Sequence, residues 1–424
     1  MRRHGGVVCT AALCASLLLA ACGPTQHTGS AAPSPTQVAQ LPVPRGKGSK
    51  VPDDFNGDGH RDLVLGDLVK AQAHADDAGI GIVYGSARGL VPGARQLIAP
   101  GKQGAATDGQ LPAVFDPETT CDLDQDGFTD LLVSTDPPYD GQGRPPVPLQ
   151  ILFGSPTGLT GKAVHLTVPP AARDGNDWPD QPVCGDFDGD GAEDLVLHAT
   201  GGQLSYLRGP FTRKGAPRAA GAPVASPGEV PTGPAADVNR DGYDDLVVRT
   251  TEGTGTSAVV LGGPQGPTRT GAALPSGIDV ALGAFGKGKA LDAAVGAMGG
   301  TSLRYDLPAA TKGSLDSAGS MLDAADFDGD GLGELVSSGS RLRLFHGRTT
   351  GLSTKDVVTV EPDAVGTSRV VGVGDYDGDG RADLAVRTYR GETKDTVTVY
   401  PGAKKGLVAA EPAVTFSTSA FLTS

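Results

Sequence analysis

One acidic motif recurs along the chain, and its residue types and spacing are typical of a loop that binds a cation. Its first copy runs from Asp54 to Asp62 and reads DFNGDGHRD. Oxygens at positions 1, 3 and 5 of such a turn converge, Gly at position 6 permits the bend, the position 7 carbonyl adds a ligand, and the position 9 carboxylate closes the shell. A shell made only of oxygens, with three or four carboxylates, suits Ca²⁺ better than Mg²⁺ or Zn²⁺.

Six intact copies predict about six calcium sites, at starting points 49 to 89 residues apart. In order of positions 1, 3, 5, 7 (backbone carbonyl) and 9, the expected ligands are Asp54, Asn56, Asp58, His60 and Asp62; Asp122, Asp124, Asp126, Phe128 and Asp130; Asp186, Asp188, Asp190, Ala192 and Asp194; Asp237, Asn239, Asp241, Tyr243 and Asp245; Asp326, Asp328, Asp330, Leu332 and Glu334; Asp375, Asp377, Asp379, Arg381 and Asp383.

A seventh copy has lost its ligands. Ala284, Gly286 and Gly288 replace the first three, and only Asp292 remains at position 9. We expect this copy to bind no metal.

The same letters open an EF-hand loop, but an EF-hand needs Glu at position 12 and flanking helices. Position 12 is instead Leu65, Val133, Leu197, Val248, Ser337 or Val386. Short apolar runs at positions 10 to 12 favour a strand that leaves the loop. Merely solvated acidic turns would require the same spacing to arise six times by coincidence.

Composition points to an all-β chain that does not bind nucleic acid. The 424 residues include 64 Gly and 33 Pro, which interrupt helices and favour short strands joined by turns. The formal charge of −14 argues against nucleic acid as a partner, because phosphate binding needs a basic face. Much of this acidity is accounted for by the expected calcium ligands, so we expect a chelator to destabilise the protein.

Each repeat is predicted to form four strands. An apolar strand and a Gly-bearing turn follow each acidic loop after a gap, as at Val83-Tyr84-Gly85 and Leu152-Phe153-Gly154. One strand before the loop, one after it and two around the Gly turn make four. Seven units of roughly 50 residues predict a seven-bladed β-propeller, which leaves few exposed sheet edges.

These motifs resemble the FG-GAP, or VCBS-type, repeat family, the calcium-binding seven-bladed propellers also found in integrin α-chains. The resemblance covers residues 49–424. Phe153-Gly154 match the FG letters, and Val295-Gly296-Ala297 match the start of GAP. The sequence departs from the family at other GAP positions, carries the loop in six repeats rather than four, and shows no inserted ligand-binding domain. The resemblance therefore implies the fold and the metal more firmly than a ligand.

The N-terminus reads as an export signal with a lipid anchor. Arg2 and Arg3, an apolar stretch and a small-residue cleavage site make residues 1–21 a signal peptide. The run Leu-Ala-Ala-Cys resembles the lipobox of bacterial lipoproteins, which implies a lipidated Cys22. Residues 22–48, rich in Pro, Ser and Ala, read as a disordered tether before the propeller. We expect the mature protein on the outer face of the bacterial cell membrane.

Two structural questions stay open at this point. Cys121 and Cys184 precede acidic loops in successive repeats, and either a disulfide or two buried free thiols fits their positions. The last blade is completed either by the segment before Asp54 or by the tail around Val414 and Phe416.

The expected ligand surface lies opposite the calcium loops. Strand parity places the long insertions 66–79 and 134–148, and the connection that carries Trp178, on that face. Tyr139 and Trp178 are the ligand-binding candidates, as aromatic side chains suited to a glycan or a peptide; tolerated surface insertions are the plainer interpretation. The favoured function is a surface module that binds protein or glycan. The alternatives are a polysaccharide lyase or hydrolase and a structural envelope protein. No catalytic motif stands out, so no catalytic residue is assigned.

Overall fold

A computed structural model describes residues 39–68, 79–174, 177–250, 255–307, 311–316, 321–390 and 395–421. Two compact units divide the chain, residues 1–36 and 37–424, and every described residue belongs to the second. The predicted signal peptide and the predicted lipidation site at Cys22 therefore lie outside the described residues. In the part of the chain that is described, no helix is long and apolar enough to cross a membrane.

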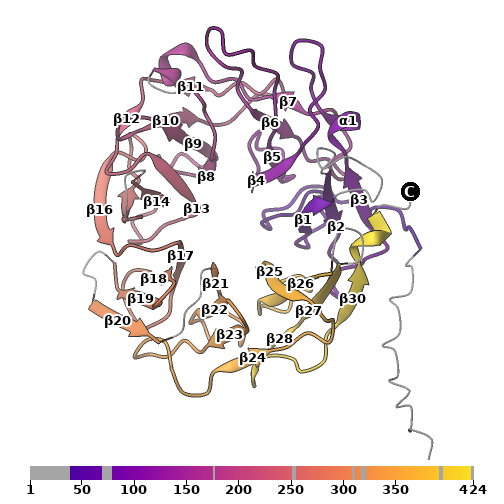
Figure 1. Cartoon of the computed structure of the whole chain (residues 1–424), viewed down its shortest axis with the longest axis vertical. Helices are drawn as coiled ribbons and strands as arrows, with labels where there is room; N and C mark the ends of the chain where they lie inside the picture. The colour runs from indigo at the N-terminus through magenta and orange to yellow at the C-terminus, as the bar shows by residue number, and fades with distance from the viewer. Residues whose placement is uncertain are drawn as a thin grey trace, which may run out of the picture. The chain divides into compact units, whose positions relative to one another are not determined.

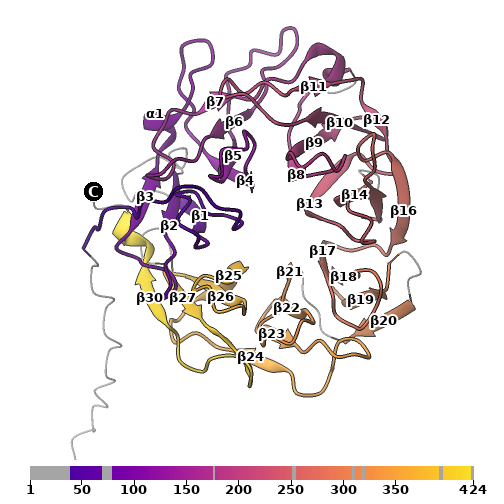
Figure 2. The same ribbon diagram turned by 180° about the vertical axis from the view of Figure 1, so that it is seen from behind.

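The second unit is an all-β, seven-bladed propeller, as predicted. Its blades are antiparallel sheets that follow one another in sequence around a ring (Figures 1 and 2). Blades 1 to 3 contain β1 (Leu63–Leu68), β2 (Gly79–Val83) and β3 (Arg95–Ile98); β4 (Asp116–Cys121), β5 (Asp130–Ser134), β6 (Leu149–Leu152) and β7 (Val164–His165); β8 (Val183–Gly185), β9 (Asp194–Ala199), β10 (Gln203–Arg208), β11 (Ala219–Ala220) and β12 (Val224–Ala225).

The remaining blades have four strands each, in sequence order from the centre outward. Blades 4 to 7 contain β13 (Val230–Ala236), β14 (Asp245–Arg249), β15 (Ser257–Leu261) and β16 (Arg269–Leu274); β17 (Asp279–Gly283), β18 (Asp292–Ala297), β19 (Gly300–Tyr305) and β20 (Thr311–Leu315); β21 (Met321–Ala325), β22 (Glu334–Ser338), β23 (Leu342–Phe345) and β24 (Val358–Val360); β25 (Thr367–Gly374), β26 (Asp383–Tyr389), β27 (Thr396–Tyr400) and β30 (Val414–Ser417).

Few described residues lie outside these sheets in regular structure. A small hairpin, β28 (Gly402–Ala403) and β29 (Leu407–Val408), occupies the turn between β27 and β30. The helical segments are α1 (Pro100–Gln103), η1 (Pro170–Arg173) and η2 (Thr418–Phe421).

The core lies between the blades. Seven buried clusters each join neighbouring blades, as where Phe55 and Ile82 of blade 1 pack with Leu131 of blade 2. Position 2 of every acidic loop supplies one buried apolar or aromatic side chain to this core: Phe55, Leu123, Phe187, Val238, Phe285, Phe327 and Tyr376. Burial of a Phe side chain stabilises the fold by roughly 1.5–3 kcal/mol, so each loop is also anchored by packing.

Ring closure settles the question that the sequence left open. The tail strand β30 pairs with β27 and completes blade 7. Residues 39–53, the described part of the segment before Asp54, add no strand to blade 1, whose sheet in the described residues consists of β1, β2 and β3. The expectation of four strands in every repeat is therefore wrong for the first. Blades 7 and 1 join through an apolar cluster that includes Leu65 and Phe416.

The tether is shorter than the sequence predicts. Leu41 forms a parallel bridge with Ala94, and the backbone N–H of Gly46 donates to the carbonyl of Asn56 at 3.0 Å. The N–H of Gly48 donates to Gly57 at 3.1 Å. Residues 41–48 thus pack on blade 1, and the expected tether boundary at residue 48 is corrected to a point before Leu41.

Candidate metal centres

In blades 2 to 7 the loop joins the innermost strand to the next strand, whereas in blade 1 it precedes β1. Backbone donors shape each intact loop around its first carboxylate. In the first loop, Asp54 accepts the N–H groups of Asp58 at 3.1 Å and Gly59 at 2.7 Å. The N–H of His60 donates to Asp58 at 3.1 Å. The same bonds recur at Asp122, Asp237, Asp326 and Asp375. The repeated spacing therefore folds into a repeated geometry.

The position 9 carboxylate has a second role that the sequence analysis missed. Asp62 accepts the N–H of Gly85 at 2.9 Å, in the Gly turn of the same blade. All six intact loops make this bond, the other donors being Gly154, Gly209, Gly262, Gly347 and Gly402. A Cβ on Gly85 would lie 2.2 Å from the carbonyl oxygen of Arg61, which explains the Gly in this turn. Position 9 thus holds the Gly turn against the loop.

Side-chain oxygens converge within the loops as a metal shell requires. One oxygen from each of Asp122, Asp124 and Asp130 lies within 4.8 Å of the others, and the same holds for Asp186, Asp188 and Asp194. Positions 1, 3 and 5 of the loop in blade 6, which are Asp326, Asp328 and Asp330, form a further group of this kind.

Buried oxygens without partners provide a test of the fit. Asp124 Oδ1, Asp186 Oδ1 and Asp188 Oδ1 are buried and accept no hydrogen bond from the described residues. A buried carboxylate oxygen without a donor is costly, and a cation offsets that cost. Two such oxygens in the third loop and one in the second suit a hard cation with oxygen ligands, so the residues fit Ca²⁺. The backbone N–H of each position 7 residue donates a hydrogen bond to the position 5 carboxylate. The position 7 carbonyls remain predicted ligands.

Burial raises the pKa of the position 9 acids. Burial, reinforced by nearby loop carboxylates, raises the pKa of Asp62 and of Asp130 to about 8. The pKa rises to about 7 at Glu334 and to about 6 at Asp194, Asp245 and Asp383, again mainly through burial. A divalent cation would neutralise the negative charge of these buried carboxylates and so favour their ionised form.

Arginines also contact the loops, and the sequence analysis did not identify them. Arg269 pairs with Asp241 at 2.8 Å, and Arg213, Arg218 and Arg381 contact Asp126, Asp190 and Asp379. Each contact is at position 5, where the carboxylates are about one-third exposed. In the second loop Arg213 Nε also lies 2.5 Å from Asp124 at position 3. An arginine beside position 5 is expected to lower the affinity of that loop for a cation.

Neighbouring loops are tied together by backbone hydrogen bonds. The position 8 N–H of one loop donates to the position 1 carbonyl of the preceding loop, as from Thr129 to Asp54 at 3.0 Å and from Ala382 to Asp326 at 2.8 Å. A residue beyond the Gly turn adds a second bond, as from Ser155 to Phe55 at 3.2 Å and from Phe211 to Leu123 at 2.7 Å. Backbone hydrogen bonds therefore link successive loops from blade 1 to blade 7 on one face.

The degenerate copy is built without a full set of acids. Asp292 accepts the N–H of Gly286 at 2.8 Å and that of Asp306 at 2.6 Å. Asp306, from the turn after β19, accepts the N–H groups of Lys289 at 2.7 Å and Ala290 at 2.9 Å. One carboxylate from outside the loop thus satisfies the position 6 and position 7 N–H groups, which positions 1 and 5 satisfy in the intact loops.

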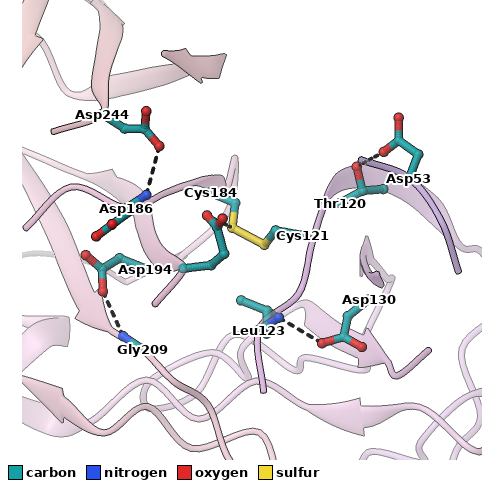
Figure 3. Close-up of a disulfide and its surroundings, with 11 residues drawn as sticks. Asp53, Thr120, Cys121, Leu123, Asp130, Cys184, Asp186, Asp194, Gly209 and Asp244 are labelled. Carbon is teal, nitrogen blue, oxygen red and sulfur yellow. Dashed lines mark hydrogen bonds between the residues drawn. A yellow bond between two sulfur atoms is a disulfide. The ribbon is translucent and has the colours of Figure 1, made fainter. Parts of the chain in front are cut away.

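A disulfide joins blades 2 and 3. Cys121 ends β4 and Cys184 lies in β8, and their sulfur atoms are bonded (Figure 3). Both strands are innermost strands that precede an acidic loop. Of the two alternatives that the sequence left open, the structure therefore shows the disulfide.

The face opposite the loops carries both aromatic candidates. Tyr139, in the loop between β5 and β6, is 44% exposed and lines a surface hollow of about 470 Å³ with Asp108, Gln110 and Arg144. Trp178, before β8, is 39% exposed and lies outside this hollow. The guanidinium of buried Arg173 donates to the carbonyls of Pro145 at 3.0 Å and Asp177 at 2.8 Å. Two of the three predicted insertions therefore meet; most of the third lies outside the described residues.

A comparison with protein families supports the repeat. Residues 326–386, from the loop in blade 6 into β26, match a family described as FG-GAP-like repeat. No curated protein matches the chain. Similar solved structures include the Dos1 propeller, at 10% identity and a TM-score of 0.46, over 88% of this chain and 87% of that one.

Two further solved structures are similar at the same level. An Agrocybe aegerita lectin, described by its specific recognition of non-reducing terminal N-acetylglucosamine, is 15% identical with a TM-score of 0.43, over 62% of this chain and 72% of that one. BBS1N in complex with ARL6DN is 12% identical with a TM-score of 0.43, over 89% of this chain and 100% of that one. The chain is thus a seven-bladed β-propeller that contains an FG-GAP-like repeat.

Proposed function

We propose that this protein is a calcium-stabilised propeller that acts as an interaction module, exported and held on the outer face of the cell membrane by a lipid on Cys22. The observation that carries the proposal is the recurrence of one loop geometry, with converging carboxylates and buried oxygens that lack donors. Six calcium ions would neutralise these loops, and the hydrogen bonds between loops would pass that stabilisation around the ring.

The geometry favours binding on the face opposite the metals. On the metal face the loop backbones already bond to one another, whereas the other face carries the hollow beside Tyr139. An aromatic ring next to Asp108, Asp140 and Arg144 offers a stacking surface with hydrogen-bonding groups around it. This combination suits a glycan, and Trp178 is proposed as a second contact for a longer chain.

A glycan array and a calcium count test the two parts separately. The purified protein is screened on an array with calcium present, and native mass spectrometry counts the bound ions. We expect Tyr139→Ala to weaken glycan binding about tenfold or more, since a buried aromatic contact is lost. The matched control is Met298→Ala, because Met298 is 87% exposed in the turn between β18 and β19 on the same face. Equal binding by both variants would remove the hollow from the proposal.

The anchor and the absence of catalysis need their own tests. Cys22→Ser should move the protein from the membrane fraction to the soluble exported fraction, because the acyl chains supply the stable anchor. Incubation of the protein with polysaccharides should release no new reducing ends or unsaturated products. Their appearance would replace the binding module by a polysaccharide-active enzyme.

A further inference from the structure

Among the described residues, blade 1 lacks the innermost strand that the other six blades possess. Those blades begin with β4, β8, β13, β17, β21 and β25, each of which leads into an acidic loop. Blade 1 begins instead with β1, the strand after its loop. The chain turns away at Asp53, where φ is 56°, and residues 46–49 bond to the loops of blades 1 and 2. The inner edge of β1 is therefore left without a neighbouring strand.

Two hydrogen bonds show which backbone groups face this edge. The N–H of Asp62 donates to the carbonyl of Asp53 at 2.9 Å, so Asp62 faces the inner side. The carbonyl of Gly66 accepts Arg387 Nη1 at 2.7 Å, from blade 7. Backbone groups alternate along a strand, so Val64, between these two residues, also directs its N–H and carbonyl inward. Among the described residues neither group of Val64 has a partner on that side.

A hollow of about 390 Å³ lies along this edge, within the size range of ligand pockets. Pro117 and Thr119 of β4 form one wall, and Val371 and Val373 of β25 form the other. These are the innermost strands of the two adjacent blades, so the hollow occupies the place of the missing strand. In blade 2 the equivalent place is filled, since Thr120 and Thr119 pair with Leu131 and Leu132.

The uncompensated charge around the hollow is negative. Its arginines already have carboxylate partners, because Arg61 pairs with Asp53 at 2.6 Å and Arg387 with Asp395 at 2.8 Å. Glu118 also lines the hollow, and burial raises its pKa. Asp67 lines it too. No cation among the described residues forms a salt bridge with Glu118 or Asp67, so a cationic side chain would complement them.

We propose that the inner edge of β1 binds an extended segment of a partner protein that carries a Lys or Arg. The segment adds as an antiparallel strand, its backbone bonds to Val64, its small apolar side chains contact β4 and β25, and its cationic side chain approaches Glu118. A free strand edge beside pockets for alternate side chains is the usual setting of strand addition. This site lies apart from the hollow at Tyr139 and does not depend on a glycan ligand.

Peptide selection tests the proposal without altering the fold. A displayed library of random octapeptides is selected on the calcium-loaded protein, and the best binder is synthesised with an N-methyl group at each backbone position in turn. Strand addition predicts that methylation at alternate positions weakens binding about tenfold, because those N–H groups face β1, while the positions between them tolerate it. A selection without binders, or a loss of affinity with no alternation, would overturn the proposal.

A charge variant identifies the site on the protein. Glu118→Gln should lower the affinity for the selected peptide about three- to tenfold. It should not change the affinity for a version of the peptide with Gln in place of its Lys or Arg. Glu361→Gln is the matched control, since Glu361 is exposed and lies in the connection between β24 and β25, outside the hollow. Equal affinity of both variants would contradict the proposal. A dimer that the peptide dissociates would assign the edge to a second copy of the chain and not to a partner protein.

Discussion

Thr129 donates its backbone N–H to the carbonyl of Asp54 at 3.0 Å, across the boundary between blades 1 and 2. Thr129 is position 8 of the second acidic loop and Asp54 is position 1 of the first. The side chain of Asp54 is an expected calcium ligand, while its carbonyl holds the neighbouring blade. The predicted metal site and the blade contact therefore share a residue, and we expect loss of the metal to loosen the boundary as well as the loop.

Calcium removal should lower the melting temperature by about 10 °C or more. At a calcium concentration one hundred times the dissociation constant, one ion stabilises the native state by about 2.7 kcal/mol, and six loops multiply this effect. A thermal melt with and without chelator measures the change, and Mg²⁺ in excess serves as the control. An unchanged melting temperature would show that the loops do not use metal for stability.

One substitution should remove one ion. Asp124→Ala deletes a position 3 carboxylate with a buried oxygen that accepts no hydrogen bond from the described residues. Native mass spectrometry should count one calcium fewer than in the unaltered protein, because the remaining shell is incomplete. Asp363→Ala is the control, as Asp363 is exposed and lies outside every loop. A full complement of ions in the Asp124 variant would rule out this residue as a ligand.

The effect of calcium should grow as the pH rises from about 5.5 to 8.5. Without metal, burial raises the pKa of Asp62 and Asp130 to about 8, so the native state holds protons that the unfolded chain has already lost. Stability of the metal-free protein then falls as the pH rises through this range. Calcium displaces these protons, so its apparent affinity rises over the same range. Melts with calcium and with chelator at several pH values should diverge toward pH 8.5; parallel curves would contradict this.

The repeat, the fold class and the family resemblance could be predicted because they depend on local spacing. Seven copies of one loop, each followed by an apolar run and a Gly turn, determine the number of blades and the face on which the loops lie. The missing strand of blade 1 could not be predicted in this way. Residues 44–53 could equally have paired with β1; what turns them away is the left-handed backbone at Asp53 and their contacts with the loops of blades 1 and 2.

Contacts between blades could not be predicted from the sequence either. The pairing of Cys121 with Cys184 depends on how two successive blades are placed, and their positions one and two residues before their loops did not decide it. The arginines that contact the position 5 carboxylates lie at no fixed distance from their loops in the sequence, so spacing did not reveal them. The position 9 acid, in contrast, was predicted as a ligand, but its hydrogen bond to the Gly turn was not predicted, although the Gly recurs in most repeats.

Packing between blades should be sensitive to loss of a loop aromatic. Phe327, at position 2 of the loop in blade 6, is fully buried between blades 6 and 7. Phe327→Ala should reduce the free energy of unfolding by about 3–5 kcal/mol through lost burial and the resulting cavity. Chemical denaturation measures this, and Met298→Ala should change it by less than about 0.5 kcal/mol, because Met298 is exposed. Similar losses in the two variants would show that this boundary is not a core.

Loss of the disulfide should destabilise the protein without removing calcium. Cys121 and Cys184 are 63 residues apart, and a crosslink that closes a loop of this length stabilises a native state by about 2–4 kcal/mol, mainly by restricting the unfolded chain. The double variant Cys121→Ser with Cys184→Ser should therefore unfold at a lower denaturant concentration. Its calcium count should not change, because neither sulfur belongs to a loop shell. Denaturation and native mass spectrometry on the same sample separate the two effects, and a loss of ions from the second or third loop would show that the crosslink also shapes the metal sites.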